Sequence, residues 1–460
     1  MSAQRKNAIT VVKAETRQRL AELDEPDGLD EALLNNYENG AGAIEGAQFA
    51  RISAATSIGR GAHAASAGAD RTLSRMSALS VAPKWFMRDY LATKEIILSS
   101  WFNLLLICVP LGWASAFLGW GPISTFTLNF LSLIPLALIL GDITEDLAVR
   151  FGDVVGGLIN ATFGNVVEIM VSLFALFKNL FTVVAASLLG SILSNLLLVL
   201  GCSFFLGGLF NSVQTFNAVS NRACSSLLML ACIGISIPSA ASMILRNANS
   251  PTPDPDADPL DPEVHERWIL EVSRGTAIIL LVCYMCYLAF QLKTHSYLFK
   301  GDDDDAVPML TLGTSIGLLT VITAVVAICS EFLTDSIKDV SKQTHLSEAF
   351  IGLIILPIAG NACEHLTACI VAMRNKMDLS MGVAVGSSIQ IALFAIPFNV
   401  VVGWATGHPF SLDFTPFAAL VLVVCVVNAN FVTADATSHW LLGVQLIALY
   451  CLVSVAYFYQ

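Results

Sequence analysis

Long apolar runs restrict the fold of this chain more than any other feature of its sequence. About 20 apolar residues in a helix cross the hydrocarbon layer of a membrane, and several runs of that length occur here between polar breaks. Hydrocarbon offers no hydrogen-bond partners, so a run inside it must satisfy its own backbone groups, as a helix does. The chain is 55% hydrophobic and 13% charged over 460 residues, which is too apolar for a soluble domain. We therefore expect an all-α polytopic membrane protein.

The apolar runs predict eleven transmembrane helices. The expected spans are residues 97–118, 122–143, 151–177, 181–209, 221–245, 272–292, 309–333, 347–374, 379–406, 413–433 and 440–458. The eleven cysteines fall mostly inside these runs, where we expect them to pack as small apolar residues.

The second half of the chain repeats the first at a fixed offset of 196 residues. The matching pairs are Gly156 and Gly352, Gly164 and Gly360, Asn179 and Asn375, Gly190-Ser191 and Gly386-Ser387, and Gly207 and Gly403. This offset pairs the second to sixth helices with the seventh to eleventh. Because five is an odd number, the second copy must start on the opposite side of the membrane, as in the inverted repeats of many ion-coupled transporters.

These patterns predict five parts. They are a disordered cytosolic tail (1–90), an extra helix (97–118), a first inverted repeat (122–292), an acidic cytosolic linker (293–308) and a second inverted repeat (309–460). The cytosolic location of the N-terminus follows from the positive-inside tendency, because basic residues precede the first apolar run: Arg71, Arg75, Lys84, Arg88 and Lys94.

The linker contains a run of four aspartates, Asp302, Asp303, Asp304 and Asp305. Such a run is usually just solvated. Clustered carboxylates also suit a regulatory patch that collects or senses hard cations with low affinity. Both interpretations stay open.

Each repeat carries one Gly-Asn-x-x-Glu motif inside an apolar helix, formed by Gly164, Asn165 and Glu168 and again by Gly360, Asn361 and Glu364. A glutamate in mid-membrane costs about 3 kcal/mol and needs a partner or a function. The Gly-Asn pair weakens the helix and frees backbone carbonyls, while the next half-helix begins at the glutamate. Carbonyls, an amide oxygen and a carboxylate together suit Ca²⁺ and similar hard cations.

The helices that follow the two motifs add further polar residues: Ser191, Ser194, Asn195, Ser387, Ser388 and Gln390. Ser191 and Ser194 are spaced i and i+3 and so share a helix face, and Ser387 and Gln390 repeat this spacing. Small polar residues also serve plain helix packing. Their repetition opposite two buried carboxylates favours a cation site.

His365 follows the second motif glutamate, whereas Ile169 occupies the equivalent position in the first repeat. A histidine there either carries protons or hydrogen-bonds a neighbouring backbone group, and the sequence favours neither. Zinc hydrolysis is not supported, because Glu364 and His365 alone are too few ligands.

The two buried glutamates suggest ion exchange. Burial favours the protonated form of a carboxyl group, and Ca²⁺ binds only the ionised form, so protons and Ca²⁺ compete for the same group. A carrier that crosses loaded with one or the other is an antiporter. Each proton moving down one pH unit contributes about 1.4 kcal/mol, so concentrating Ca²⁺ substantially requires several protons per ion.

Residues 158–168 (LINATFGNVVE) and 357–365 (PIAGNACEH) resemble the two signature motifs of the Ca²⁺/H⁺ exchanger (CAX) family, within the cation/Ca²⁺ exchanger superfamily. The resemblance covers about residues 97–460. It is strongest to fungal vacuolar exchangers, notably at residues 376–379 (KMDL) and 386–390 (GSSIQ).

The resemblance implies ten core helices plus one, alternating access by sliding helix pairs, and low-affinity, high-capacity loading of Ca²⁺, with some Mn²⁺, into an acidic vacuole. Glu168 and Glu364 would be the exchanging carboxylates, and Gln390 a neighbour of the cation site. Val166 and Cys363 stand where alanine is common. The linker would be a Ca²⁺-responsive helix, although its four aspartates make it shorter than many versions.

We expect a vacuolar-membrane protein without a cofactor, whose transported ions are Ca²⁺ and H⁺. Its expected partner is the lipid bilayer, with neither nucleic acid nor an obligatory protein partner. The nearest alternative is a Na⁺-coupled Ca²⁺ exchanger of the same fold. An intramembrane hydrolase would need a nucleophile and base or metal ligands, not two symmetry-related acids, and a passive channel would need repeated pore-loop filters. We therefore expect a transporter and not an enzyme.

Overall fold

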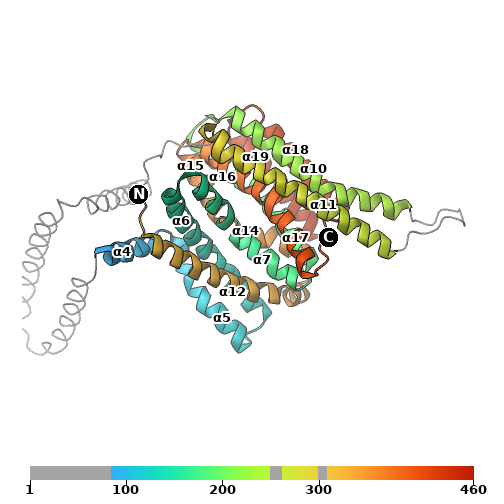
Figure 1. The fold of residues 1–460 in the computed structure, drawn as a ribbon, viewed down its shortest axis with the longest axis horizontal. Helices are drawn as coiled ribbons and strands as arrows, with labels where there is room; N and C mark the ends of the chain where they lie inside the picture. The colour runs from blue at the N-terminus through green and yellow to red at the C-terminus, as the bar shows by residue number, and fades with distance from the viewer. Residues whose placement is uncertain (1–83, 249–261, 299–307) are drawn as a thin grey trace, which may run out of the picture. The chain divides into compact units, whose positions relative to one another are not determined.

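The computed structural model describes residues 84–248, 262–298 and 308–460, and nearly all of these residues are helical (Figure 1). Most of the predicted tail and the run Asp302–Asp305 lie outside the described residues. The chain divides into two compact units. The smaller unit ends at Ile97 and resumes with residues 305–315, and the larger unit contains the rest.

Helix α4 (Lys84–Leu98) belongs almost entirely to the smaller unit. Its Asp89 carboxylate, only 4% exposed, accepts hydrogen bonds from the backbone N–H of Thr311 (2.9 Å) and from the hydroxyls of Thr311 and Thr314 (2.5 Å each). Asp89 thereby supplies acceptors at the start of helix α12 (Leu312–Thr344). Residues 84–90, predicted as the end of a disordered tail, are therefore helical, because packing and these hydrogen bonds stabilise α4.

The larger unit is a helical bundle, and four of its described segments are π-helical. Its elements are η1 (Trp101–Ile107), α5 (Cys108–Leu118), α6 (Pro122–Phe163), α7 (Val166–Phe177), α8 (Phe181–Leu193), η2 (Ser194–Val199), α9 (Leu200–Phe210), β1 (Gln214–Thr215), α10 (Ala218–Ala248), α11 (Pro262–Ala289), η3 (Phe290–Thr294), η4 (Ser296–Leu298), most of α12, α13 (Glu348–Phe350), η5 (Ile351–Ile355), α14 (Leu356–Gly360), α15 (Ala362–Met373), α16 (Met377–Gln390), η6 (Ile391–Ala395), α17 (Ile396–Thr406), α18 (Pro416–Val432), β2 (Thr437–Ser438) and α19 (Trp440–Phe458).

Eight helical spans among the described residues are long and apolar enough to cross a membrane. A ninth is formed if α13–α14 and α15, which are bent by 57° at their junction, count as one broken span. Helices α7 and α18 are also apolar but shorter. The polytopic helical membrane fold is therefore confirmed, whereas the count of eleven spans stays a prediction.

Helix α6 reverses its direction within its own length. A Cβ on Gly156 would lie 2.7 Å from the Cα of Ala148, although eight residues of straight helix span about 12 Å. Residues 144–150, expected to separate two helices, are themselves helical. They contain neither glycine nor proline to end a helix. The close approach of Gly156 to Ala148 places the reversal between these two residues.

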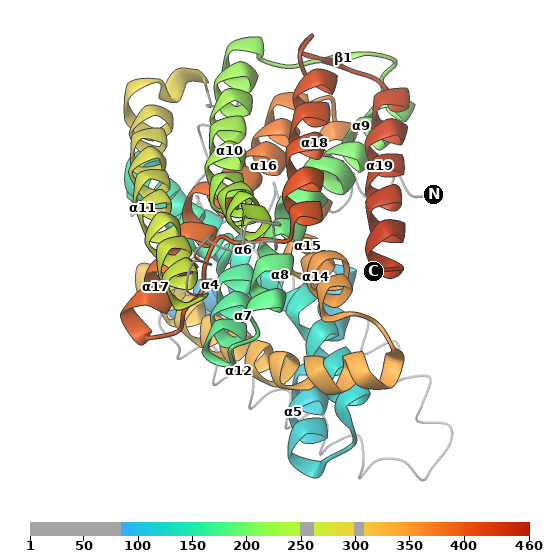
Figure 2. The ribbon, with the colours of Figure 1, turned by 90° about the vertical axis from the view of Figure 1, so that its right-hand side faces the viewer.

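The most deeply buried span runs through α8, η2 and α9, with 89% of its most apolar window inside the protein. Helix α8 packs against η5 and α9 against α19. The strands β1 and β2 form an antiparallel pair, Gln214 opposite Ser438, which ties the α9–α10 connection to the α18–α19 connection (Figure 2). The buried α8–α9 span therefore lies beside both broken motifs.

Candidate cation site

Both Gly-Asn-x-x-Glu motifs break a helix where the sequence predicts a break. Asn165 (φ −102°, ψ 20°) and Asn361 (φ −83°, ψ 16°) leave the helical conformation and precede α7 and α15. Glu168 and Glu364 then lie in the first turns of these helices. The partial positive charge of a helix N-terminus favours a carboxylate at that position.

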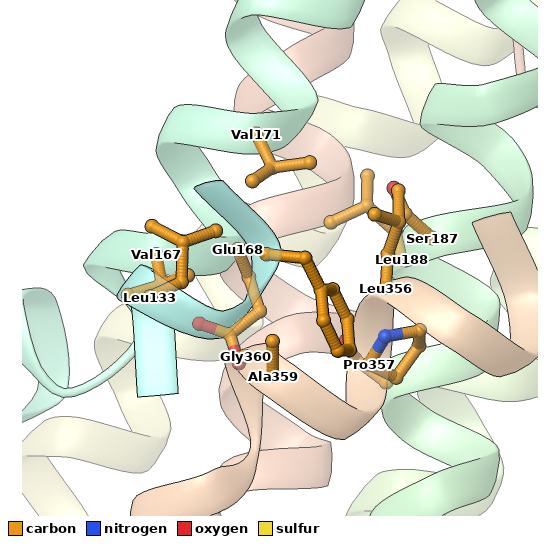
Figure 3. Close-up of a pocket in the computed structure, with 12 residues that line it drawn as sticks. Leu133, Val167, Glu168, Val171, Ser187, Leu188, Leu356, Pro357, Ala359 and Gly360 are labelled. Carbon is orange, nitrogen blue, oxygen red and sulfur yellow. The ribbon is translucent and has the colours of Figure 1, made fainter. Parts of the chain in front are cut away.

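The tertiary structure brings the two motifs together. A Cβ on Gly360, in the second motif, would lie only 2.8 Å from Oε1 of Glu168 in the first, and Figure 3 shows the Glu168 carboxylate against Gly360. Glu168 and Glu364 are close enough for their charges to repel each other. The two motifs, 196 residues apart in the sequence, therefore form one site.

Several oxygens at this site lack a hydrogen-bond donor. Both carboxylate oxygens of Glu168 and Oε2 of Glu364 are buried and accept no hydrogen bond from any other described residue. The same holds for the amide oxygens of Asn195 and Asn361. An unsatisfied buried acceptor costs about 1–3 kcal/mol, and more if it is charged. Such oxygens are suited to bind a cation or, on the carboxylates, a proton.

Hydrogen bonds cross between the two repeats at equivalent pairs of residues. The Asn165 amide donates to Oε1 of Gln390 and accepts from the Ser387 hydroxyl (3.1 Å). The Asn361 amide donates to the backbone carbonyl of Ser191 (3.3 Å). The pairs Asn165–Ser387 and Asn361–Ser191 are related by the 196-residue offset, so each motif asparagine is held by the polar helix of the other repeat.

The remaining predicted residues divide into two groups. Asn195 donates to the Ser387 hydroxyl (2.9 Å) and so joins the network. The Ser388 hydroxyl instead donates to Ala384 in its own helix (2.9 Å), and Ser194 lies beside Tyr450 of α19. Ser194 begins the π-helical segment η2. The wider turn of a π-helix gives side chains a different direction from the one they would have in a regular α-helix. His365 is half-buried next to Glu364.

The surroundings of the two glutamates differ. Glu168 is 7% exposed and packs on Gly360, whereas Glu364 is half-buried. A Cβ on Gly164, the counterpart of Gly360, would approach Asn160 and not Glu364. The site is therefore more open at Glu364 than at Glu168.

A cavity of about 20 Å³ adjoins Glu168, with its lining residues drawn in Figure 3. Its walls come from α6, α7, α8 and α14 and are apolar except for Glu168, Ser187 and Ser191. The repeat does not point to Ser187, because the equivalent residue of the second repeat is Val383. Ser187 could still be recognised from the sequence, because it lies four residues before Ser191 and so on the same helix face.

The donors gathered here are oxygens. Among the described residues, no group of three or more His, Cys, Asp and Glu side chains could hold a metal ion. The site instead combines two carboxylates with amide, hydroxyl and carbonyl oxygens. Oxygen ligands without sulfur or imidazole match hard cations.

A bundle of apolar helices in which two broken helices each bring a glutamate to one site has the architecture of a membrane ion transporter, not of an enzyme. A family model described as "Sodium/calcium exchanger protein" matches residues 121–293 and 314–459. The chain belongs to this family, as the sequence motifs predict.

Curated relatives and solved structures agree with this assignment. The chain is 41% identical over 372 residues to the vacuolar calcium ion transporter of Schizosaccharomyces pombe, covering 80% of this chain and 87% of the relative. It is 38% identical over 377 residues to the Ca²⁺/H⁺ antiporter of Synechocystis sp., covering 78% and 97%. The crystal structure of the selenium-substituted Ca²⁺/H⁺ antiporter protein YfkE matches with a TM-score of 0.64 and 33% identity, covering 78% of this chain and 99% of that one.

Proposed function

We propose that this chain is a secondary active antiporter that exchanges cytosolic Ca²⁺ for H⁺ from an acidic vacuole. Glu168 and Glu364 bind the cation or protons in turn. One observation carries the proposal: the buried Glu168 carboxylate, which accepts no hydrogen bond from another described residue, packs against Gly360 of the other motif. A carboxylate so placed needs either a cation or a proton to balance its burial.

Competition between the two ions supplies the coupling. Ca²⁺ requires ionised carboxylates, and the repulsion between Glu168 and Glu364 favours protonation of at least one when no cation is bound. An empty site with both carboxylates charged is costly to move through the membrane. The carrier therefore changes its access with either Ca²⁺ or protons bound, which is antiport.

The other site residues have supporting roles in this proposal. Gly164 and Gly360 allow close approach at the helix breaks, and Asn165 and Asn361 hold the breaks in place. Ser191, Asn195, Ser387 and Gln390 line or orient the site. Ser194 and Ser388 lie outside the hydrogen-bonded network, and His365 serves as a proton relay at the more open side. No cofactor takes part, and Mn²⁺ is a second transported ion.

Alternating access through an inverted repeat is part of the same proposal. It is supported by the reciprocal hydrogen bonds of Asn165 and Asn361. It is also supported by the positions of η2 (Ser194–Val199) and η6 (Ile391–Ala395), π-helical segments at equivalent positions of the two repeats. The eleven-span layout, with the N-terminus in the cytosol, gives the two repeats opposite orientations.

The proposed location follows the names of the relatives, and the proposed direction follows from an acidic lumen. The S. pombe protein is named as a vacuolar calcium ion transporter, and a rice relative, 37% identical over 396 residues, as a vacuolar cation/proton exchanger. We accordingly place this chain in a vacuolar membrane, where the lumen supplies the protons.

Ca²⁺ uptake into proteoliposomes under an imposed pH gradient tests the proposal. We expect uptake that collapses with a protonophore and is abolished separately by Glu168→Gln and Glu364→Gln, since a neutral amide can neither release a proton nor balance Ca²⁺. Glu271→Gln, at an exposed position of α11, is the matched control and should transport normally. Uptake that ignores the pH gradient but follows a Na⁺ gradient would support the Na⁺-coupled alternative instead.

The acidic linker is proposed to regulate transport and not to conduct it. Replacing Asp302, Asp303, Asp304 and Asp305 with asparagine is expected to change the dependence of the transport rate on cytosolic Ca²⁺ while leaving the maximal rate within about twofold, because a low-affinity regulatory patch senses Ca²⁺ without carrying it. Uptake assays over a Ca²⁺ concentration series check this. Complete loss of transport would place the linker in the ion pathway.

A further inference from the structure

A further polar contact between the two repeats lies one helical turn from Glu168. Ser172 follows Glu168 by four residues on α7 and so shares its helix face. The Asn399 amide of α17 donates a hydrogen bond to the Ser172 hydroxyl (3.0 Å). Both residues are fully buried, and α17 packs against α7. The half-helix that carries Glu168 is therefore bound to the other repeat at this point as well as at Asn165.

Hydrogen bonds connect Asn399 to both of its neighbouring elements. An amide nitrogen carries two hydrogens, and that of Asn399 also donates to the backbone carbonyl of Ala395 (2.9 Å), the last residue of η6. The Ser172 hydroxyl in turn donates to the carbonyl of Ile169 (3.0 Å), in the first turn of α7. A chain of hydrogen bonds thus runs from the end of η6 to the residue that follows Glu168.

We infer that Asn399 is a positioning residue for ion binding, which acts through Ser172 to hold α7 so that the Glu168 carboxylate stays at the site. This inference rests on the proposed function, because it assigns a role in ion binding by Glu168. Asn165, three residues before Glu168, is bound by Gln390. Gln390 and Asn399 belong to one span, formed by α16, η6 and α17. Glu168 therefore lies between two anchors provided by the same span.

The position of Glu168 has little tolerance. Its Oε1 lies only 2.8 Å from the Cβ position of Gly360. Four residues of helix span about 6 Å, so a shift of α7 at Ser172 is carried almost unchanged to Glu168. Groups that bind a ligand work best when supporting side chains hold them within about 0.5 Å, and the bond from Asn399 is suited to that purpose.

The second repeat lacks this anchor. The residue equivalent to Ser172 is Ala368, which has no hydroxyl, and the residue equivalent to Asn399 is Ser203. The Ser203 hydroxyl donates to a carbonyl of its own helix (2.9 Å) and lies 4.0 Å from the sulfur of Cys369, a weak acceptor. The anchor is therefore specific to the half-helix of Glu168.

A purely structural role is the competing explanation, because buried hydrogen bonds also stabilise a fold. The second polar atom of the Asn399 side chain argues against it. Its Oδ1 is buried and accepts no hydrogen bond from any other described residue, and an unsatisfied acceptor lowers stability. Leucine has nearly the same branched shape and would avoid this loss. Asparagine is therefore a poor choice for stability alone, whereas its N–H groups supply the bond to Ser172.

The experiment measures pH-driven Ca²⁺ uptake by proteoliposomes over a Ca²⁺ concentration series. A neutral hydrogen bond contributes about two- to tenfold to an equilibrium constant. We expect Asn399→Leu and Ser172→Ala each to raise the Ca²⁺ concentration for half-maximal uptake about fivefold and to leave the maximal rate within about twofold. The double variant should show no larger shift than Asn399→Leu, because both changes break the same bond.

Ser203→Ala is the matched control, since Ser203 is the buried counterpart of Asn399 and bonds within its own helix. It should leave the half-maximal concentration unchanged. An unchanged value in either single variant, shifts that add in the double variant, or an equal shift in the control would overturn the inference. If Asn399→Leu fails to fold, Ser172→Ala decides. Wild-type uptake that ignores the pH gradient would instead overturn the proposed function.

Discussion

Gly360 of the second motif lies where a side chain would collide with the carboxylate of the first. A Cβ at this position would lie 2.8 Å from Oε1 of Glu168 and 3.1 Å from its carboxyl carbon. The carboxylate ends a flexible side chain and can move away, so a larger residue would displace the ligand without unfolding the protein. The Gly-Asn pair thus serves two purposes, because the helix break also makes room for the partner glutamate.

Gly360→Ala is therefore expected to lower Ca²⁺ uptake at least about tenfold, since the methyl group would displace the Glu168 carboxylate and a loss of about 1.4 kcal/mol in ion binding is tenfold. Its melting temperature should change little. Gly382→Ala is the control, because no atom lies within 4 Å of its Cβ position and alanine is the better helix former. Uptake assays and thermal unfolding in detergent check both variants. Equal activity of the two would show that the Gly360 contact is unimportant for transport.

At the scale of elements, the two repeats share local conformations as well as motifs. Asn179 and Asn375, paired by the repeat, both have positive φ angles, 55° and 60°, and both follow the half-helix that carries a motif glutamate. Asparagine tolerates this conformation better than most residues. The packing of the elements is less symmetric. The backbone of Leu353 in η5 touches the Cβ position of Gly190 on α8, whereas the equivalent Gly386 has nothing within 4 Å.

This difference predicts unequal effects of the same substitution. Gly190→Ala would place a methyl group 2.7 Å from the Cα of Leu353, and two helix backbones cannot move apart without loss of packing. We expect it to destabilise the protein by about 1–3 kcal/mol, while Gly386→Ala should be neutral or slightly stabilising. Thermal unfolding of the two variants in the same detergent measures this. A stable Gly190→Ala variant would contradict the tight α8–η5 contact.

At the scale of the whole molecule, ion binding and folding are linked. A ligand that binds only the folded state adds about 2.7 kcal/mol to the free energy of unfolding at 100 times its Kd. The site draws on both repeats through Glu168 and Gly360, so a bound ion would hold the two halves together. In the proposed mechanism protons compete for the same carboxylates, so this stabilisation should depend on pH.

We therefore expect Ca²⁺ to raise the melting temperature at about pH 8 and to have little effect at about pH 5.5, where protons occupy the carboxylates. Glu168→Gln should remove the Ca²⁺ effect at both pH values, whereas Glu271→Gln should retain it. Thermal unfolding with Ca²⁺ or with a chelator checks this. A Ca²⁺ effect that is equal at both pH values would argue against competition between the two ions.

The sequence alone determined the membrane class, the family and the positions of both helix breaks. Apolar runs, Gly-Asn pairs and a constant offset are properties of the chain itself, and hydrocarbon leaves the backbone few alternatives to a helix. The same information identified Glu168, Glu364 and the two motif asparagines as neighbours of one site.

Only the tertiary structure decided how these residues meet. The reversal of α6 between Ala148 and Gly156, the place of Ser194 beside Tyr450 and the cavity beside Glu168 all depend on which helices pack together. The two glutamates are equivalent in sequence but differ in exposure. A repeated sequence specifies two similar halves, and the differences between them arise only from contacts between distant parts of the chain.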